Sequence, residues 1–268
     1  MKLDLSEFQN PYERTTRDTW LIFKILAEFV DGFELMRRVD PAVSIFGSAR
    51  LKANSAYGKM TERICETVTS TGFSLITGGG PGLMEAANKG ARRGINTYKR
   101  RFPKDRPPAS VGLAIQLPFE PSANEFVDLE IKFRYFFVRK VMFAKYARAF
   151  IIMPGGFGTL DELFEALTLI QTNKMERFPI VMMGRNYWEG LIEWMKKVCI
   201  KQGALSQKHL DLIHITDDPE EAVEIIARHY TDLVSLIQKR KDFKSKRKPK
   251  SMSRAKTIKK PTKKRKKS

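Results

Sequence analysis

Short apolar runs alternate along the chain with segments whose apolar residues recur at helical spacing. After an N-terminal helical region over residues 6–40, the pattern predicts strands at 42–48, 73–77, 111–117, 149–153, 179–183 and 212–216. Helices are predicted between and after them, at 56–71, 83–93, 130–147, from Thr159, at 188–201 and from Pro219. Continuously apolar strands that alternate with helices are typical of a buried parallel sheet. We therefore predict an α/β fold in which helices cover both faces of a parallel sheet.

The distribution of charged residues separates the C-terminal part of the chain from the rest, which the apolar pattern alone does not do. The formal net charge is +19, yet residues 239–268 hold 17 Lys and Arg residues against a single acid, Asp242. The rest of the chain is close to neutral, with 32 basic and 29 acidic residues. We predict an N-terminal helical extension (1–40), an α/β domain (41–238) and a disordered lysine-rich tail (239–268). Residues 94–110 are basic and contain proline, and we expect them to form a loop.

Cysteine, histidine and apolar content exclude several classes of protein. Two cysteines, Cys65 and Cys199, imply no disulfide framework, so we expect a reducing, cytoplasmic environment. The first residues lack the apolar run of a signal peptide, and no apolar stretch reaches the ~18 residues of a membrane span. The three histidines show no metal-ligand spacing. We expect neither a metal nor a membrane partner.

Two predicted strands end in glycine-rich turns that lead directly into helices. The glycines are Gly78, Gly79, Gly80 and Gly82 in "LITGGGPGLMEAANKGA" (75–91), and Gly155, Gly156 and Gly158 in "FIIMPGGFGTLDELFEAL" (150–167). In open α/β sheets ligands bind beyond the carboxyl ends of the strands, where helix N-termini attract phosphate. Glycines let a backbone approach such an anion closely, although they also simply make tight turns. Two such turns in one sheet favour a phosphate site.

Neither turn has the spacing of a familiar nucleotide loop. Both GxGxxG and GxxxxGK[ST] are absent from the two turns, which disfavours ATP hydrolysis. A lysine decarboxylase that uses pyridoxal phosphate is not predicted, because no lysine stands in a recognisable Schiff-base setting. We expect no cofactor, and we expect the phosphate to belong to a small substrate.

Four stretches in order make residues 42–200 resemble the LONELY GUY family, whose hallmark is PGGxGTxxE. They are "SIFGSAR", "ITGGGPGLMEAANKGA", "FRYFFVRKVMFAKYA" and "PGGFGTLDELFEALTLIQT". The resemblance implies a Rossmann-like fold, a homodimer or higher homo-oligomer, and hydrolysis of the N-glycosidic bond of a nucleoside 5′-monophosphate to free base and ribose 5-phosphate. The implied substrate is AMP-like, with a cytokinin riboside monophosphate among the options. Glu85 stands where plant-type members usually carry glycine, so the chain is more similar to a longer bacterial branch.

Carried over by position, the resemblance implies that Arg139 and Glu162 are the catalytic pair. It also implies that Thr159 and the two glycine turns hold the phosphate, with Lys140 as a further candidate ligand. The chemistry agrees, since a carboxylate stabilises positive charge at an anomeric carbon and activates water. However, "TLDE" is also typical of a capping box, with Thr159 as the cap and Glu162 reaching back to it.

Arg139 also stands out by its place on the predicted helix. It lies among aromatic residues, away from the polar stripe formed by Arg134, Lys145 and Arg148. A guanidinium in such surroundings needs a partner, because an unpaired buried charge is costly. The partner is either a structural carboxylate or a group of the substrate. Lys140 is also off the stripe.

Two further hypotheses belong to other functional classes. A non-catalytic nucleotide-binding or pterin-cofactor carrier is possible on the same fold, because fold does not fix function. The basic tail is of a kind that binds nucleic acid without sequence specificity, and it is equally typical of a solvated tail that keeps the protein soluble.

Overall fold

The computed structural model describes residues 11–116 and 123–246, with side chains within 19–116 and 123–232. The described chain divides into two compact units, one up to His229 and one from Tyr230 onward. The first unit holds the sheet and its helices, and the second continues the last helix. Among the described helices, none combines the length and apolar character that a membrane span requires.

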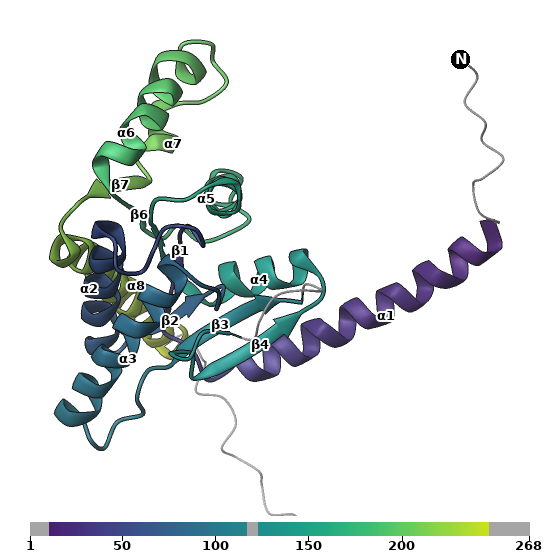
Figure 1. Ribbon diagram of the computed structural model, residues 1–268, viewed down its shortest axis with the longest axis horizontal. Coiled ribbons are helices and arrows are strands. Elements are labelled where there is room, and N and C mark those ends of the chain that lie inside the picture. The colour runs from purple at the N-terminus through teal and green to yellow at the C-terminus, as the bar shows by residue number, and fades with distance from the viewer. Residues whose placement is uncertain (1–10, 117–122, 247–268) are drawn as a thin grey trace, which may run out of the picture. The chain divides into compact units, whose positions relative to one another are not determined.

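In the described residues, seven parallel strands form a single sheet in the order β4-β3-β2-β1-β5-β6-β7 (Figure 1). The strands are β1 (Ala42–Phe46), β2 (Ser74–Thr77), β3 (Ser110–Ile115), β4 (Leu129–Phe133), β5 (Ala147–Ile152), β6 (Ile180–Met183) and β7 (Ile213–Thr216). The strand order reverses between β1 and β5, and such a switch point is where open α/β sheets bind ligands. The predicted Rossmann-like α/β fold is confirmed.

Helices cover both faces of this sheet. They are α1 (Pro11–Met36), α2 (Ala56–Ser70), α3 (Leu83–Arg101), α4 (Phe136–Tyr146), α5 (Phe157–Gln171), α6 (Arg185–Trp194), the π-helical turn η1 (Met195–Ile200), α7 (Gln207–Leu210) and α8 (Pro219–Lys246). The central strand β1 shows the two layers. Its Phe46 ring lies 4.9 Å from Phe143 of α4, and Ser44 Oγ donates to the Phe143 carbonyl at 3.2 Å. Because side chains alternate along a strand, Val43 and Ile45 face the opposite layer, which α2 and α3 form.

The predicted helix over 130–147 is wrong at its start. Residues 129–133 form β4, which pairs with β3 in parallel, and α4 begins only at Phe136. Lys132 of this edge strand is exposed while Ile131 and Phe133 are buried. An edge strand with charged residues among its apolar ones lacks the continuous apolar run that identifies the inner strands.

The predicted loop over 94–110 is also wrong in its first part, because α3 continues to Arg101. Gly90 and Gly94 lie where α3 crosses α2. A Cβ at Gly90 would come within 2.1 Å of the Glu62 carbonyl, and one at Gly94 would come equally close to the Glu66 carbonyl. These glycines allow close packing of the two helices.

The last helix differs in length from the prediction. α8 continues through Lys246, past the predicted start of the tail at 239. Residues 247–268, which make up most of the predicted tail, lie outside the described residues.

Candidate functional site

Ser48 connects the two glycine turns at the switch point. It follows β1, and its backbone N–H donates to the Pro154 carbonyl at 3.0 Å, at the start of the second glycine turn. Its own carbonyl accepts from Leu83 N–H at 3.0 Å, at the start of α3. The Ser48 backbone therefore holds both turns beside the end of the central strand.

The second glycine turn is closely packed at Gly155 and open at the next two glycines. A Cβ at Gly155 would lie 2.1 Å from Thr159 Oγ1, whereas one at Gly156 or Gly158 would meet nothing within 4 Å. Tyr187 Oη, from the start of α6, donates to the Gly155 carbonyl at 3.0 Å. The turn is thus held in place at Gly155 and unobstructed at Gly156 and Gly158. The first N–H groups of α5 have no intrahelical acceptors, so they are available to an anion there.

The first glycine turn depends on left-handed backbone and on a side-chain brace. Gly79 and Gly82 have φ of 75° and 71°, and a Cβ at Gly82 would lie 2.7 Å from the Ser48 carbonyl. Asn124 Nδ2 donates to the carbonyls of Gly79 and Gly80, each at 3.0 Å. Both carbonyls thereby take a fixed orientation, which leaves the turn preorganised.

A buried polar network supports Asn124 from within the sheet. Asn88 of α3 accepts from Thr77 Oγ1 at 2.8 Å and from Asn124 Nδ2 at 3.0 Å, and it donates to Ser110 Oγ at 2.9 Å. Thr77 Oγ1 in turn accepts the Gly79 N–H at 2.9 Å. Satisfied buried networks of this kind make a local structure rigid.

The capping-box interpretation of "TLDE" is wrong. α5 begins at Phe157, its N-cap is Gly156, and no side chain caps it. Thr159 and Glu162 are therefore interior helical residues, and both are buried. Glu162 is only 6% exposed. Its burial must have a cause other than helix capping.

Burial raises the pKa of the Glu162 carboxyl from 4.5 to about 7. The nearby cations Lys140 and Arg139 act in the opposite direction, while Glu165 and Asp161 add to the rise. A carboxyl that is half ionised near neutral pH has the property that enzymes give to a general base.

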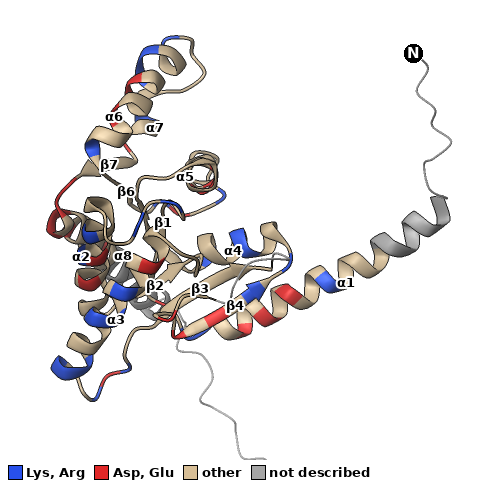
Figure 2. Ribbon diagram, viewed as in Figure 1, with Lys and Arg blue, Asp and Glu red and all other residues tan. Residues whose placement is uncertain are grey.

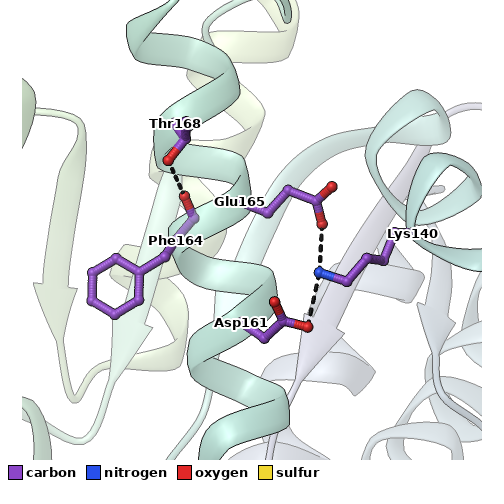
Figure 3. Close-up of a pocket in the computed structure, with 5 residues that line it drawn as sticks. All are labelled: Lys140, Asp161, Phe164, Glu165 and Thr168. Carbon is purple, nitrogen blue, oxygen red and sulfur yellow. Dashed lines mark hydrogen bonds and ion pairs between the residues drawn. The ribbon is translucent and has the colours of Figure 1, made fainter. Parts of the chain in front are cut away.

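Arg139 and Lys140 of α4 have different surroundings, because Lys140 pairs with α5 whereas Arg139 lies over rings of its own helix. The Arg139 guanidinium lies over the rings of Phe136 and Phe143, at 5.0 and 5.8 Å from their centroids. These contacts confirm its predicted aromatic surroundings. Lys140 Nζ lies 2.8 Å from both Asp161 Oδ2 and Glu165 Oε2, as Figure 3 shows. Although burial lowers the pKa of Lys140, its hydrogen bonds to Asp161 and Glu165 raise it above the ordinary value.

An open groove of about 530 Å³ runs past this ion cluster (Figure 3). Its lining residues are Lys140, Asp161, Phe164, Glu165 and Thr168. The predicted site residues therefore form two connected groups. The first group is the second glycine turn with Thr159 and Glu162 of α5, which α4 contacts through the ion pair of Lys140 with Asp161. The second group is the first glycine turn, and the backbone of Ser48 bonds to both turns.

The family comparison agrees with this arrangement. The family model described as "Possible lysine decarboxylase" matches residues 84–226, which is more than half of the chain. The chain is a member of the LONELY GUY family. The matched range contains α4 and α5, and with them Arg139 and Glu162.

Curated members of the LONELY GUY family are similar at low identity. The cytokinin riboside 5′-monophosphate phosphoribohydrolase LOG3 of Arabidopsis thaliana is 24% identical over 73% of this chain and 86% of its own length. The enzyme of that name from Mycobacterium tuberculosis is 26% identical over 65% and 89%. A pyrimidine/purine nucleotide 5′-monophosphate nucleosidase of Escherichia coli K12 is 30% identical over 42% of this chain and 24% of its own length.

A solved structure has a similar fold. The X-ray structure of a protein named TM1055 superposes with a TM-score of 0.50 at 21% identity, covering 70% of this chain and 98% of that protein. A molybdenum cofactor binding protein from the phototrophic bacterium Rippkaea orientalis gives a TM-score of 0.48 at 20% identity, covering 70% and 96%.

Three residues that organise the site are absent from the sequence prediction: Ser48, Asn124 and Tyr187. Ser48 had a detectable signal, because it is the last residue of the first predicted strand, at the carboxyl edge of the sheet, and stands within the stretch SIFGSAR. Asn124 and Tyr187 had none, since each acts through a hydrogen bond to a glycine carbonyl that is distant in sequence.

Proposed function

We propose that this protein hydrolyses the N-glycosidic bond of a nucleoside 5′-monophosphate, releasing free base and ribose 5-phosphate. AMP is the first substrate to test. The names of the relatives support this class of reaction, since they include riboside monophosphate phosphoribohydrolases and a nucleotide nucleosidase. Their low identity leaves the base to be found by experiment.

The observation that carries this proposal is the state of Glu162. Its carboxyl is buried behind an open helix N-terminus, and its pKa is raised to about 7. No helix cap accounts for this burial. Keeping a carboxylate out of water is unfavourable, and a catalytic task at neutral pH gives a reason for it.

In the proposed reaction, the substrate phosphate binds the first turn of α5 and the glycine turn before α3, with Thr159 beside it. The bond from C1′ to the base nitrogen breaks as positive charge develops on the ribose. The Glu162 carboxylate stabilises that charge and takes a proton from water, whose oxygen bonds to C1′. The departing base nitrogen takes up a proton, so the atoms balance. Arg139 orients Glu162 and donates to the base or the phosphate.

Lys140 has a supporting part in this proposal. Its ammonium is already bound by two carboxylates on α5, so binding a phosphate requires it to exchange one of them. Until it does so, its charge opposes the rise in the pKa of Glu162.

The test is a chromatographic assay of the purified protein with AMP, GMP, CMP, UMP and IMP. We expect free base and ribose 5-phosphate in equal amounts. Glu162→Gln should fold and lose about 100- to 10,000-fold in turnover, as the loss of a general base does. Arg139→Ala should weaken both substrate binding and turnover.

Glu165→Gln is the matched control, because it removes a carboxylate one turn further along the same helix. It should keep more than about a tenth of wild-type turnover. If Glu162→Gln also keeps more than about a tenth, the catalytic role is wrong. Tight nucleotide binding without any product would support the non-catalytic carrier instead.

We also propose that the protein is a homodimer or a higher homo-oligomer. Trp20, Phe23 and Val30 of α1 are 63, 59 and 62% exposed, on a segment whose other side packs against α4 and β4. Exposed apolar residues gathered on one surface are typical of an interaction site. Large aromatic side chains have about 150–250 Å² each, and 40–63% of each side chain is exposed here, so these residues together with Phe136, Phe137 and Val141 of α4 offer on the order of 600 Å², close to the ~800 Å² that one partner usually contributes.

A further inference from the structure

The positive charge of the α/β domain is concentrated at one place, the C-terminal end of α3. Residues 99–106 contain five basic residues and one acid, Asp105. Without them, residues 1–238 hold 27 basic and 28 acidic residues, a balance of −1. The positive excess of the chain before its tail therefore lies in these eight residues. We call their cations the α3 basic tip: Lys99, Arg100, Arg101, Lys104 and Arg106.

The basic tip differs from the rest of α3 in how its charges are paired. Lys89 and Arg93 form ion pairs with Glu62 at 3.0 and 2.9 Å, and Arg92 lies 3.9 Å from Asp128. Within the described residues, no carboxylate lies within ion-pair distance of the basic tip. Residues 99–106 are all exposed, and Figure 2 shows Lys and Arg gathered at this end of α3.

Helix stabilisation explains only part of this charge. Cations in the last turn interact favourably with the helix dipole, which accounts for Lys99, Arg100 and Arg101. Lys104 and Arg106 lie beyond the end of the helix, where that effect has faded. Five like charges within eight residues repel one another, and a polyanion would relieve that repulsion.

An aromatic pair stands within the basic tip. The rings of Tyr98 and Phe102 lie 4.9 Å apart, and the Arg101 guanidinium lies 5.3 Å from the centroid of Phe102. The Tyr98 ring packs over Gly72, where a Cβ would come within 3.1 Å of it. The pair is thereby fixed to the body of the protein, while Phe102 remains 36% exposed.

We propose that the α3 basic tip binds single-stranded nucleic acid. Cations that follow the phosphates and an aromatic ring on which a base stacks are the two parts of such sites. The exposed ring favours a single strand over a duplex, whose bases are already stacked. The tip and the glycine turn lie at opposite ends of α3, roughly 28 Å apart for a helix of 19 residues. A strand bound there is therefore distinct from any nucleotide that the glycine turns hold.

The test uses the full chain and a fluorescein-labelled 20-nucleotide single strand, followed by anisotropy between 50 and 200 mM NaCl. The first variant replaces all five tip cations by Gln. It should bind at least about 30-fold more weakly at 100 mM NaCl, and the slope of log K against log salt should fall by about 3, at ~0.7 for each phosphate contact. Phe102→Ala should bind roughly tenfold more weakly with an unchanged slope, because only stacking is lost.

The matched control replaces five tail cations by Gln: Lys250, Arg254, Lys256, Lys259 and Lys260. This control removes the same number of positive charges as the tip variant. When Phe102→Ala is added to it, single-strand binding should still weaken roughly tenfold. The tip residues are exposed, so we expect both variants to melt like the wild type, with nucleotide hydrolysis unchanged in the tip variant.

Three results would overturn the proposal. In the first, the tip variant loses no more affinity than the tail control. In the second, Phe102→Ala binds like the wild type. In the third, the tip binds a duplex of the same length or phosphatidylserine vesicles more tightly than it binds the single strand.

Discussion

Glu162 is a carboxyl whose surroundings favour its neutral form. Burial has the largest effect, and two neighbouring carboxylates add to it against the charges of Lys140 and Arg139. The folded protein therefore holds a proton between about pH 4.5 and 7 that the unfolded chain has released. The free energy of unfolding must fall as pH rises through this range, with the loss complete above about pH 7.

We predict that Glu162→Gln is more stable than the wild type at pH 8.5 and equally stable at about pH 4, below both pKa values of the glutamate. The rise in pKa from 4.5 to about 7 corresponds to on the order of 3 kcal/mol, or roughly 5 to 10 °C in Tm. At about pH 4 the glutamate is mostly protonated in both the folded and the unfolded chain and is similar in shape to glutamine, so the two Tm values should agree within about 2 °C. Differential scanning calorimetry at the two pH values measures this.

The control is Glu189→Gln, which removes an exposed carboxylate from α6. Its Tm should follow the wild type at both pH values. An equal Tm for Glu162→Gln and the wild type at pH 8.5 would mean that Glu162 is ionised at little cost, which contradicts the raised pKa.

Sequence alone identified Glu162 but not its environment. The sequence TLDE fits a helix cap as well as a catalytic carboxylate. The residue at which α5 begins decides between the two interpretations. That residue cannot be predicted from the sequence, because Gly155, Gly156 and Gly158 can each adopt helical or non-helical backbone conformations. Only the observed start at Phe157 moves Glu162 into the buried interior of the helix.

In the turn that leads into α5, Gly155 and Gly158 are glycines for different reasons. Gly155 is required by packing, because a Cβ there would lie 2.1 Å from Thr159 Oγ1 and 3.1 Å from Ser48 N. Gly158 faces open space, so packing does not require it. Stability and binding should therefore respond differently to alanine at the two positions.

We predict that Gly155→Ala destabilises the protein by about 1 to 3 kcal/mol, the cost of overpacking. Gly158→Ala should leave the free energy of unfolding unchanged or raise it by about 0.5–1 kcal/mol, because alanine is favoured in a helix. Gly158→Ala should nevertheless weaken AMP binding about tenfold, since its methyl group occupies the space proposed for the phosphate. Urea unfolding and titration calorimetry measure the two effects. Loss of stability in Gly158→Ala, or unchanged AMP affinity, would contradict this division.

Among the elements, six of the seven described strands were predictable, including β7 at one edge of the sheet, and β4 at the other edge was not. β1, β2, β3, β5 and β6 are buried over most of their length because helices cover both faces, and their mainly apolar sequences show this. β4 was missed because its charged residues merge with the helical pattern that follows. The prediction ended α3 before Gly94, where a basic, proline-containing loop was expected, although this glycine serves contact with α2.

At the scale of the whole molecule, the exposed apolar surface of α1 and α4 is the feature that a folded monomer does not explain. Glu28 of α1 accepts the backbone N–H groups of Arg134 and Tyr135, which fixes the helix beside β4 and α4. Trp20 and Phe23 lie further towards the N-terminal end of α1 and remain exposed.

We predict that the wild type is a homodimer or larger at about 10 µM, and that Trp20→Asp with Phe23→Asp shifts it towards monomer by at least tenfold in Kd. Two charges in an apolar interface account for this change. Light scattering after size-exclusion chromatography gives the mass. Val198→Asp, on η1, is the control and should leave the mass unchanged. A monomeric wild type would refute the assembly.

The position of Ser48 has a consequence for how this chain tolerates changes of length during evolution. Exposed connections, such as residues 176–177 before β6, accept inserted residues because little depends on their path. The connection after β1 does not share this freedom. Ser48 bonds to both glycine turns through its backbone, and its Oγ accepts from Arg50 N–H and Leu51 N–H. One residue gained or lost between Phe46 and Leu51 would displace both turns together. Lineages of this protein should therefore vary in length after α5 while keeping this short segment at constant length.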